Sequence, residues 1–225
     1  MTAAAFFDLD RTLLSHSSSL ALAGGFRRRG LIGRRQLLKA RVAQLLFVRF
    51  GAGHGRAGQT ADTATAILRD LPVETLREIV ADAWEPVLRP LVYREALDEV
   101  AVHTARGERV YLVSGALQEV VDVLAHELSL DGALGSRAEV RDGVFTGRLE
   151  RRLLGAGKAE ALAELAEKER HDLTGSTAYS DSHTDLPFLE AVGTPVAVNP
   201  DRELRRIAGE RGWAIRVYRE TLGSG

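Results

Sequence analysis

The spacing of apolar residues divides the 225-residue chain into three stretches. Residues 3–9 form an apolar run that ends in acidic residues, which is typical of a buried strand. From Leu20 to Val92 the apolar residues recur every three or four positions, which is the helical period. Within this stretch the pattern predicts helices at 34–50, 61–69 and 74–84 and a glycine-rich loop at 51–58.

After Pro90 short apolar runs alternate with helical patterns. The expected helices span 95–105, 117–127, 158–170 and 202–210; the expected strands span 110–113, 178–179 and 195–198, with a hairpin over 139–148 that turns at Asp142-Gly143. This alternation favours an α/β fold, a Rossmann-like parallel sheet with helices on both faces. The helical stretch is then an insertion. We expect an α/β core of residues 1–13 and 92–225 and an inserted α-helical cap domain of residues 14–91.

Composition removes several classes of function. The chain has no cysteine, which excludes disulfides, thiolate metal sites and a cysteine nucleophile and fits a cytoplasmic protein. The first ten residues carry acidic rather than basic side chains, so we expect no secretory signal in them. No apolar run approaches the ~20 residues that a membrane-spanning helix needs.

Basic residues are concentrated in one part of the chain. Between Arg11 and Ala61 there are ten basic residues and no acidic one, although the net charge of the whole chain is −1. A basic segment beside an acidic body suggests contact with an anionic substrate or surface. The basic helix expected at 34–50 could contact an anionic membrane surface. We favour a different interpretation, in which it is an amphipathic helix of the cap that covers an active site. No nucleic-acid-binding motif is present.

Candidate catalytic residues end the first expected strand. Asp8 and Asp10 alternate along it, so their side chains lie on the same side. Two neighbouring buried carboxylates are costly unless a cation lies between them, and oxygen-only ligands favour Mg²⁺. A carboxylate also serves as a nucleophile, with its neighbour as general acid and base. Taken alone, such a pair is more often a solvated acidic turn.

Three further elements are predicted at the carboxyl edge of the sheet, where ligands bind in open parallel sheets. Ser114 and Gly115 are expected to end a strand and open a helix, which is an anion-binding geometry. Lys158 is expected at a helix start, where a cation is unfavourable unless an anion lies nearby. Asp181 and Asp185 lie on a loop after a strand and can converge on a cation. Each signal is weak alone, and their order and shared location indicate a site.

These four elements, in this order, resemble the motifs of the haloacid-dehalogenase-like superfamily, in its phosphoserine-phosphatase-like branch. The matching segments are FFDLDRTLL, LVSG, GKAEAL and SDSHTDLP, and the resemblance covers nearly the whole chain, including VAVNPDREL near its end. The resemblance implies a Mg²⁺-dependent phosphatase that hydrolyses a small phosphomonoester through an aspartyl-phosphate intermediate.

The resemblance also implies a role for each matching residue. Asp8 is the expected nucleophile, and Asp10 is the expected general acid and base. The expected magnesium ligands are Asp8, Asp10 through its backbone carbonyl, Asp181, and Asp185 through water or as a brace. The expected phosphate-binding residues are Ser114, Gly115 and Lys158, together with Thr12, which braces the loop.

Three positions depart from the pattern of phosphoserine phosphatases. Arg11 stands where a small residue is commoner. Ser17 and Asp62 stand where that branch usually carries a glutamate and an arginine for its substrate. The substrate is therefore left open beyond a small phosphorylated molecule. Two alternatives also stay open: a phosphomutase, which uses the same aspartyl-phosphate, and a module of the same fold that binds membranes or lipid headgroups.

Overall fold

The computed structural model describes residues 1–31 and 68–224. Its strands are β1 (Ala4–Phe7), β2 (Arg109–Leu117), β3 (Gly132–Arg141), β4 (Val144–Arg151), β5 (Thr177–Ser180), β6 (Thr194–Val198) and β7 (Ala214–Arg216). Its α-helices are α1 (Ser18–Arg28), α4 (Val73–Ala83), α5 (Arg94–Ala105), α6 (Gln118–Glu127), α7 (Ala156–Glu169), α8 (Leu186–Glu190) and α9 (Arg202–Arg211). A π-helical turn spans Trp84–Leu88, and 3₁₀ turns span Arg89–Leu91, Leu173–Gly175 and His183–Asp185.

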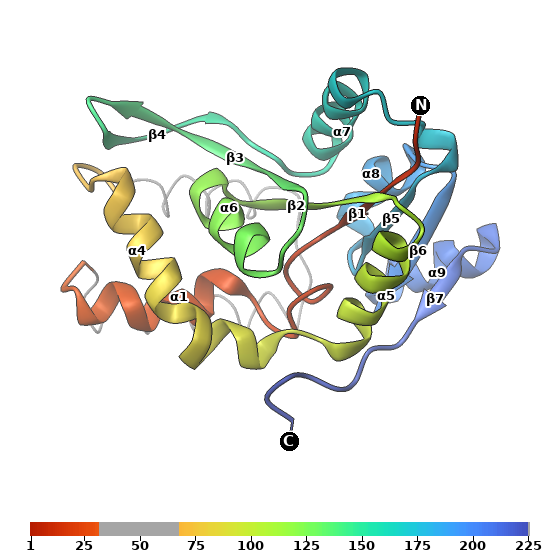
Figure 1. The fold of residues 1–225 in the computed structure, drawn as a ribbon, viewed down its shortest axis with the longest axis horizontal. Helices are drawn as coiled ribbons and strands as arrows, with labels where there is room; N and C mark the ends of the chain where they lie inside the picture. Colours follow the sequence, from red (N-terminus) through yellow and green to blue (C-terminus); the bar gives the residue numbers. More distant parts are fainter. Residues whose placement is uncertain (32–67, 225) are drawn as a thin grey trace.

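The described strands form a seven-stranded sheet in the order β4-β3-β2-β1-β5-β6-β7. Neighbouring strands are parallel, except that β3 and β4 form an antiparallel hairpin at one edge. β1 lies between β2 and β5, so both of its edges are paired (Figure 1). Strands that alternate with helices along the chain produce this parallel arrangement, and the predicted α/β fold class is confirmed.

Burial on both faces explains why β1 is apolar throughout. Ala5 and Phe7 pack into one hydrophobic cluster with residues of α1, α4, α5 and α6. Ala4 and Phe6 point the other way and pack with residues of α7, α8 and α9. Because side chains alternate along a strand, one short segment joins both halves of the core. Helices therefore cover both faces of the sheet, as predicted.

The predicted helices after residue 73 are close to those observed, each beginning and ending within two residues of its expected position. The hairpin turn is also confirmed: Asp142 and Gly143 have φ values of 50° and 78°, the positive values that a tight hairpin turn needs. β2, β3 and β4 are longer than predicted, and α8 and β7 were not predicted.

Part of the predicted insertion lies outside the described residues, namely the helix at 34–50, the loop at 51–58 and most of the helix at 61–69. Leu68 and Arg69, at the end of that last helix, form a turn. In the described part, α4 packs against α1 and α6 and shares the hydrophobic cluster of β1 (Figure 1). The division into a core and a cap domain stays a prediction.

The two expected boundaries of the insertion lie side by side. Tyr93 donates its amide to the carbonyl of Leu13 at 3.0 Å, and Ser15 donates to the carbonyl of Leu91 at 2.8 Å. The two ends of the expected insertion are thus paired with each other, and the start of α1 lies near the carboxyl end of β1, where the amide of Ser18 donates to Asp10. None of the described helices has both the length and the apolar character that crossing a bilayer demands.

Candidate active site

A buried ion-pair cluster lies beyond the carboxyl ends of β1 and β5. Nζ of Lys158 lies 2.6 Å from Oδ1 of Asp8 and 2.7 Å from Oδ2 of Asp185. The hydroxyl of Ser180 donates to the same oxygen of Asp185 at 2.8 Å. The side chains of Lys158, Asp8 and Asp185 are all buried. The structure therefore brings together three residues that the sequence placed in three separate motifs.

The sheet fixes the position of Asp8. This residue directly follows β1, and its amide donates to the carbonyl of Tyr179 on β5 at 2.9 Å. Phe7, one residue earlier, stacks on the ring of Tyr179 with centroids 4.1 Å apart. Because β1 is paired on both edges and packed on both faces, the backbone that carries Asp8 is held rigidly, as a reactive carboxylate requires.

Lys158 lies in the first turn of α7, a helix that begins immediately after Gly155, and Gly155 has a φ value of 53°. Its side chain is buried, with Nζ 5.4 Å from the centre of the Phe188 ring. A cation near a helix N-terminus opposes the helix dipole, but two carboxylates here offset that effect. The anion that the sequence analysis expected beside Lys158 is therefore present, as Asp8 and Asp185.

Burial raises the pKa values of three carboxylates, those of Asp8, Asp10 and Asp181. Burial raises the pKa of Asp8 to about 6, against the opposing charge of Lys158 and with a contribution from Asp185. Burial also raises the pKa of Asp10, and burial together with the charge of Asp8 raises that of Asp181 well above its ordinary value. Burial alone would lower the pKa of Lys158, but the charges of Asp185 and Asp8 outweigh it and raise that pKa. The site is thus short of positive charge.

The carboxylate of Asp10 is held by the start of α1, because its Oδ1 accepts the amide of Ser18 at 2.8 Å. The helix N-terminus stabilises the charged form and orients the side chain. Thr12 is fully buried, and its hydroxyl has no hydrogen-bond partner among the described residues. Its proposed part in the phosphate-binding loop is not tested by these contacts.

Asp181 lies on the loop after β5 and is fixed through its backbone, since its carbonyl accepts the amide of Asp201 at 2.8 Å. Asp201 also accepts the amide and the ring Nδ1 of His183, each at 2.9 Å, which holds the loop in place. Oδ2 of Asp181 lies 3.5 Å from Nε of Arg11. The guanidinium of Arg11, from the first motif, therefore lies beside the carboxylate of Asp181, from the last motif.

The turn that carries Arg11 has an unusual backbone. Arg11 has a φ value of 67°, in the left-handed region. This conformation costs about 1–2 kcal/mol for a residue with a Cβ atom, and glycine avoids the cost. The turn is closed by the amides of Leu13 and Leu14, which donate to the carbonyl of Leu9 at 3.0 and 2.9 Å. An arginine thus occupies a position where glycine, which has no Cβ atom, is less strained.

The prediction that Ser114 and Gly115 open a helix is wrong. β2 continues to Leu117 with an irregular register after Val113, and α6 begins only at Gln118. The reason lies in the neighbouring strand, where Ser136 donates its hydroxyl to the carbonyl of Gly115 at 2.8 Å. Both residues still lie at the carboxyl edge, since Phe7 pairs with Leu112 and Ser114 is two residues further. Their binding of phosphate stays a prediction.

Sequence reasoning missed three residues that support the site. The hydroxyl of Ser180 donates to Asp185, and the amide of Asp201 donates to the carbonyl of Asp181. The hydroxyl of Ser136 donates to the carbonyl of Gly115 and accepts the amide of Leu153 at 3.0 Å. Ser180 directly precedes the last acidic pair, and Asp201 lies at the N-terminus of α9, where its carboxylate accepts the amide of Leu204 at 2.8 Å. Both positions could have been found as capping or loop residues. No sequence signal marked Ser136.

The donor atoms at this edge suit Mg²⁺. In the described residues, no three or more carboxylate, imidazole or thiol side chains are arranged to hold a metal ion. The predicted ligands are not a set of that kind, because they combine the side chains of Asp8 and Asp181 with the carbonyl of Asp10. All are oxygens, and burial and repulsion raise the pKa values of both carboxylates, which a bound cation would reverse. Asp185 already accepts a hydrogen bond from Lys158, which favours a role in holding that lysine in place over a role as a direct ligand.

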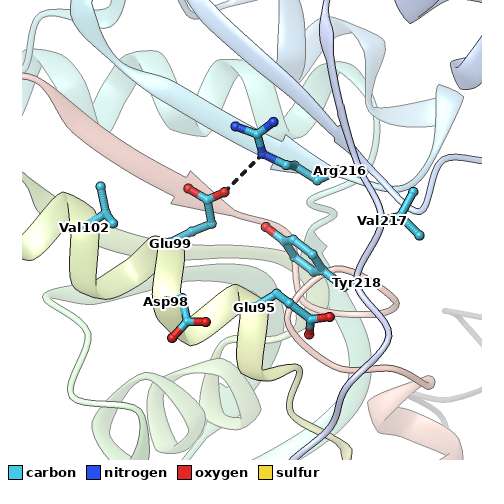
Figure 2. Close-up of a pocket in the computed structure, with 7 residues that line it drawn as sticks. All are labelled: Glu95, Asp98, Glu99, Val102, Arg216, Val217 and Tyr218. Atoms are coloured by element: carbon cyan, nitrogen blue, oxygen red, sulfur yellow. Dashed lines mark hydrogen bonds and ion pairs between the residues drawn. The ribbon is translucent and has the colours of Figure 1, made fainter.

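A separate hollow of about 350 Å³ lies between α5 and the segment that follows β7 (Figure 2). Its lining residues are Glu95, Asp98, Glu99, Val102, Arg216, Val217 and Tyr218. Arg216 pairs with Glu99 at 3.2 Å, and Glu95 accepts backbone amides of the C-terminal segment. None of the residues predicted for catalysis or for binding lines this hollow, so we assign the candidate active site to the cluster around Asp8.

Comparison with known proteins shows the family to which the chain belongs. Residues 5–190 match the haloacid dehalogenase-like hydrolase family. A Streptomyces azureus protein named for inhibition of morphological differentiation is 43% identical, over 94% of this chain and 77% of its own length. A phosphoserine phosphatase of Mycobacterium tuberculosis is 38% identical, over 97% of this chain and 72% of its own length. A crystal structure of a Bordetella pertussis protein of unknown function has a TM-score of 0.81 and 30% identity, over 96% of this chain and 99% of the other.

The chain belongs to the haloacid dehalogenase-like hydrolase family. Within that family it belongs to the phosphoserine-phosphatase-like branch, as its four motifs indicate, and it is a phosphatase.

Proposed function

We propose that the protein is a Mg²⁺-dependent phosphatase that hydrolyses a small-molecule phosphomonoester through an aspartyl-phosphate on Asp8. The observation that carries this proposal is the buried contact of Lys158 with Asp8, 2.6 Å long, at the carboxyl edge of the sheet. The lysine places positive charge beside the carboxylate, where the oxygens of a transferred phosphoryl group need it. Positioning and charge neutralisation are the main requirements of phosphoryl transfer.

In the first step an oxygen of Asp8 attacks phosphorus and the bond to the leaving oxygen breaks. Asp10 gives its proton to that oxygen as it leaves. The raised pKa of Asp10, caused by burial, favours the protonated form that a general acid requires. In the second step Asp10 takes a proton from water, whose oxygen attacks the aspartyl-phosphate. Inorganic phosphate leaves and the Asp8 carboxylate is restored.

The remaining site residues hold the reacting groups. Ser114, the amide of Gly115 and Lys158 bind phosphoryl oxygens, and Thr12 braces the loop. Asp8, the carbonyl of Asp10 and Asp181 would hold Mg²⁺, with Asp185 as a brace through Lys158 or a ligand through water. The bound ion would neutralise charge on the phosphoryl oxygens.

The proposed substrate is a small phosphorylated molecule. The proposed cap over the active site is the insertion of residues 14–91. The relative named phosphoserine phosphatase suggests an amino-acid phosphate, but Ser17 stands where we expect the acid that recognises an ammonium group. Ser17 is buried and its hydroxyl lies 2.9 Å from that of Ser19. Asp62 lies outside the described residues. We therefore propose a phosphomonoester other than phosphoserine, acted on in the cytoplasm.

The test is release of inorganic phosphate from a panel of phosphomonoesters, with Mg²⁺ or with EDTA. We expect turnover by the wild type with Mg²⁺, and a loss of roughly a thousandfold or more in kcat for Asp8→Asn, since a neutral amide is a poor nucleophile. Arg170→Gly, a change far from Asp8 in sequence at the end of α7, is the matched control and should keep its activity. Well-folded wild type that releases no phosphate from any ester would refute the proposal.

A further inference from the structure

Arg11 is the feature of the site that the proposed reaction does not use. Its Nε lies 3.5 Å from Oδ2 of Asp181, and its side chain is 41% exposed whereas that of Asp181 is 7% exposed. Among residues 1–31 and 68–224 it makes no other ion pair. Its guanidinium therefore acts as a counter-charge for one buried carboxylate, reached from the solvent side.

The backbone strengthens this interpretation. Arg11 keeps a φ value of 67°, which an arginine adopts with strain and a glycine adopts freely. The ion pair is a local reason for a long cationic side chain at this strained position. The Asp181 side chain is only 7% exposed, and Nε of Arg11 lies 3.5 Å from its Oδ2. The guanidinium thus partly supplies the positive charge that the carboxylate lacks.

A divalent cation on Asp181 would meet this arginine. Mg²⁺ binds oxygen ligands at about 2.1 Å, so an ion on the Asp181 carboxylate lies within a few ångströms of a guanidinium on the same group. Like charges at such distances repel strongly near a protein surface. Because Arg11 is exposed and has four rotatable side-chain bonds, it can swing towards solvent, whereas Asp181 is fixed by its backbone contact with Asp201.

We propose that Arg11 is a positioning residue that competes with Mg²⁺ for Asp181, so that metal binding displaces its guanidinium and the arginine lowers the affinity of the site for Mg²⁺. The inference rests on the proposed function, because it takes Asp181 as a metal ligand. In this proposal Arg11, a residue of the first motif, controls the affinity for Mg²⁺ of Asp181, a residue of the last motif.

The test is isothermal titration of Mg²⁺ into the full chain, freed of metal with EDTA and dialysed, at constant ionic strength. We expect Arg11→Gln and Arg11→Gly to bind Mg²⁺ roughly tenfold more tightly than the wild type. Arg11→Lys keeps a cation within reach of Asp181 and should stay within about threefold of the wild type. Rescue by lysine but not by glutamine identifies charge, rather than side-chain volume, as the cause.

Arg170→Gly is the matched control for backbone strain. Arg170 also has a positive φ value, 60°, but lies at the C-terminal end of α7. Glycine relieves strain at both positions, so unchanged Mg²⁺ affinity in Arg170→Gly shows that strain relief alone does not tighten binding. Equal tightening in Arg170→Gly and Arg11→Gly would contradict the proposed competition.

The outcomes separate this inference from the proposed function. If the wild type binds Mg²⁺, Asp181→Asn does not, and Arg11→Gln has wild-type affinity, the competition is wrong while the metal site stands. If neither the wild type nor any Arg11 variant binds Mg²⁺, the metal site itself is wrong and the inference falls with it. Tighter binding in Arg11→Gln that disappears in the double variant with Asp181→Asn supports both.

Discussion

Replacing Asp8 by asparagine should abolish catalysis and, in the absence of metal, make the protein more stable. The change keeps the shape of the side chain and removes a charge that the folded protein stabilises poorly. Burial raises the pKa of Asp8 from 3.8 to about 6 even with Lys158 beside it. At 1.36 kcal/mol for each pKa unit, the ionised carboxylate costs about 3 kcal/mol of folding free energy.

The sign follows from proton linkage. Between pH 3.8 and about 6 the folded protein binds the Asp8 proton more tightly than the unfolded chain does. The Asp8 contribution to stability therefore falls as pH rises through this window, and the full cost is present above it. Asparagine does not titrate. The free energy of unfolding of Asp8→Asn should therefore be about 3 kcal/mol higher than that of the wild type at pH 7.5, and the two values should be equal below pH 4.

Urea denaturation in EDTA at pH 7.5 and pH 4 measures this difference, with the fluorescence of Trp84 and Trp213 as the signal. Both tryptophans pack in the hydrophobic clusters, so unfolding should change their emission. If Asp8 is a magnesium ligand, as proposed, Mg²⁺ should stabilise the wild type more than the variant, because the variant lacks the charge of that ligand. The reasoning is refuted if Asp8→Asn is less stable than the wild type at pH 7.5 by an amount that does not change at pH 4.

Other substitutions test the supporting contacts by urea denaturation and phosphate release. Lys158→Met should cost about 3–5 kcal/mol at pH 7.5, because it leaves two buried carboxylates without their cation, and should abolish turnover; a loss below 1 kcal/mol would contradict the buried pairing. Ser180→Ala should cost about 1–2 kcal/mol, since it leaves its carboxylate partner short of one hydrogen bond, and should lower turnover far less than Lys158→Met. Gly193→Ala should cost about 2 kcal/mol or more, because its new Cβ would lie 1.8 Å from the carbonyl oxygen of Thr174. Gly209→Ala, in α9 with open space around it, is the matched control and should gain about 0.5–1 kcal/mol.

Local signals in the sequence were sufficient for most of the described strands and helices, although not for β7, for α8 or for the full lengths of β2, β3 and β4. The apolar run before Asp8 predicts a strand buried on both faces, and the Asp142-Gly143 pair predicts a tight turn by its need for positive φ. The position of Lys158 could also be interpreted, because a cation at a helix start indicates an anion nearby. In each case a residue affects the conformation or the charge requirement of residues close to it in sequence, and a sequence pattern can therefore indicate the effect.

Contacts between distant segments could not be predicted in the same way. The Lys158 ammonium lies between Asp8 and Asp185, and only the assembled sheet brings these three residues to one edge. The extension of β2 past Ser114 depends on a hydroxyl from β3, and the ion pair of Arg11 depends on the loop after β5. Each of these features requires the order of strands, which alternation alone does not fix.

The central place of β1 has a consequence for synthesis of the protein. β1 leaves the ribosome first, yet its partners β2 and β5 begin only at Arg109 and Thr177. At about 5–20 residues per second, roughly 10–30 seconds pass before the second partner is made. Both edges of the apolar strand are unpaired until β2 is made, and one edge stays unpaired until β5 is made, which makes the nascent chain prone to aggregation. Release of the chain after β2 but before β5 should therefore yield a species that depends on chaperones, and the backbone that carries Asp8 gains its second paired edge only once β5 has been made.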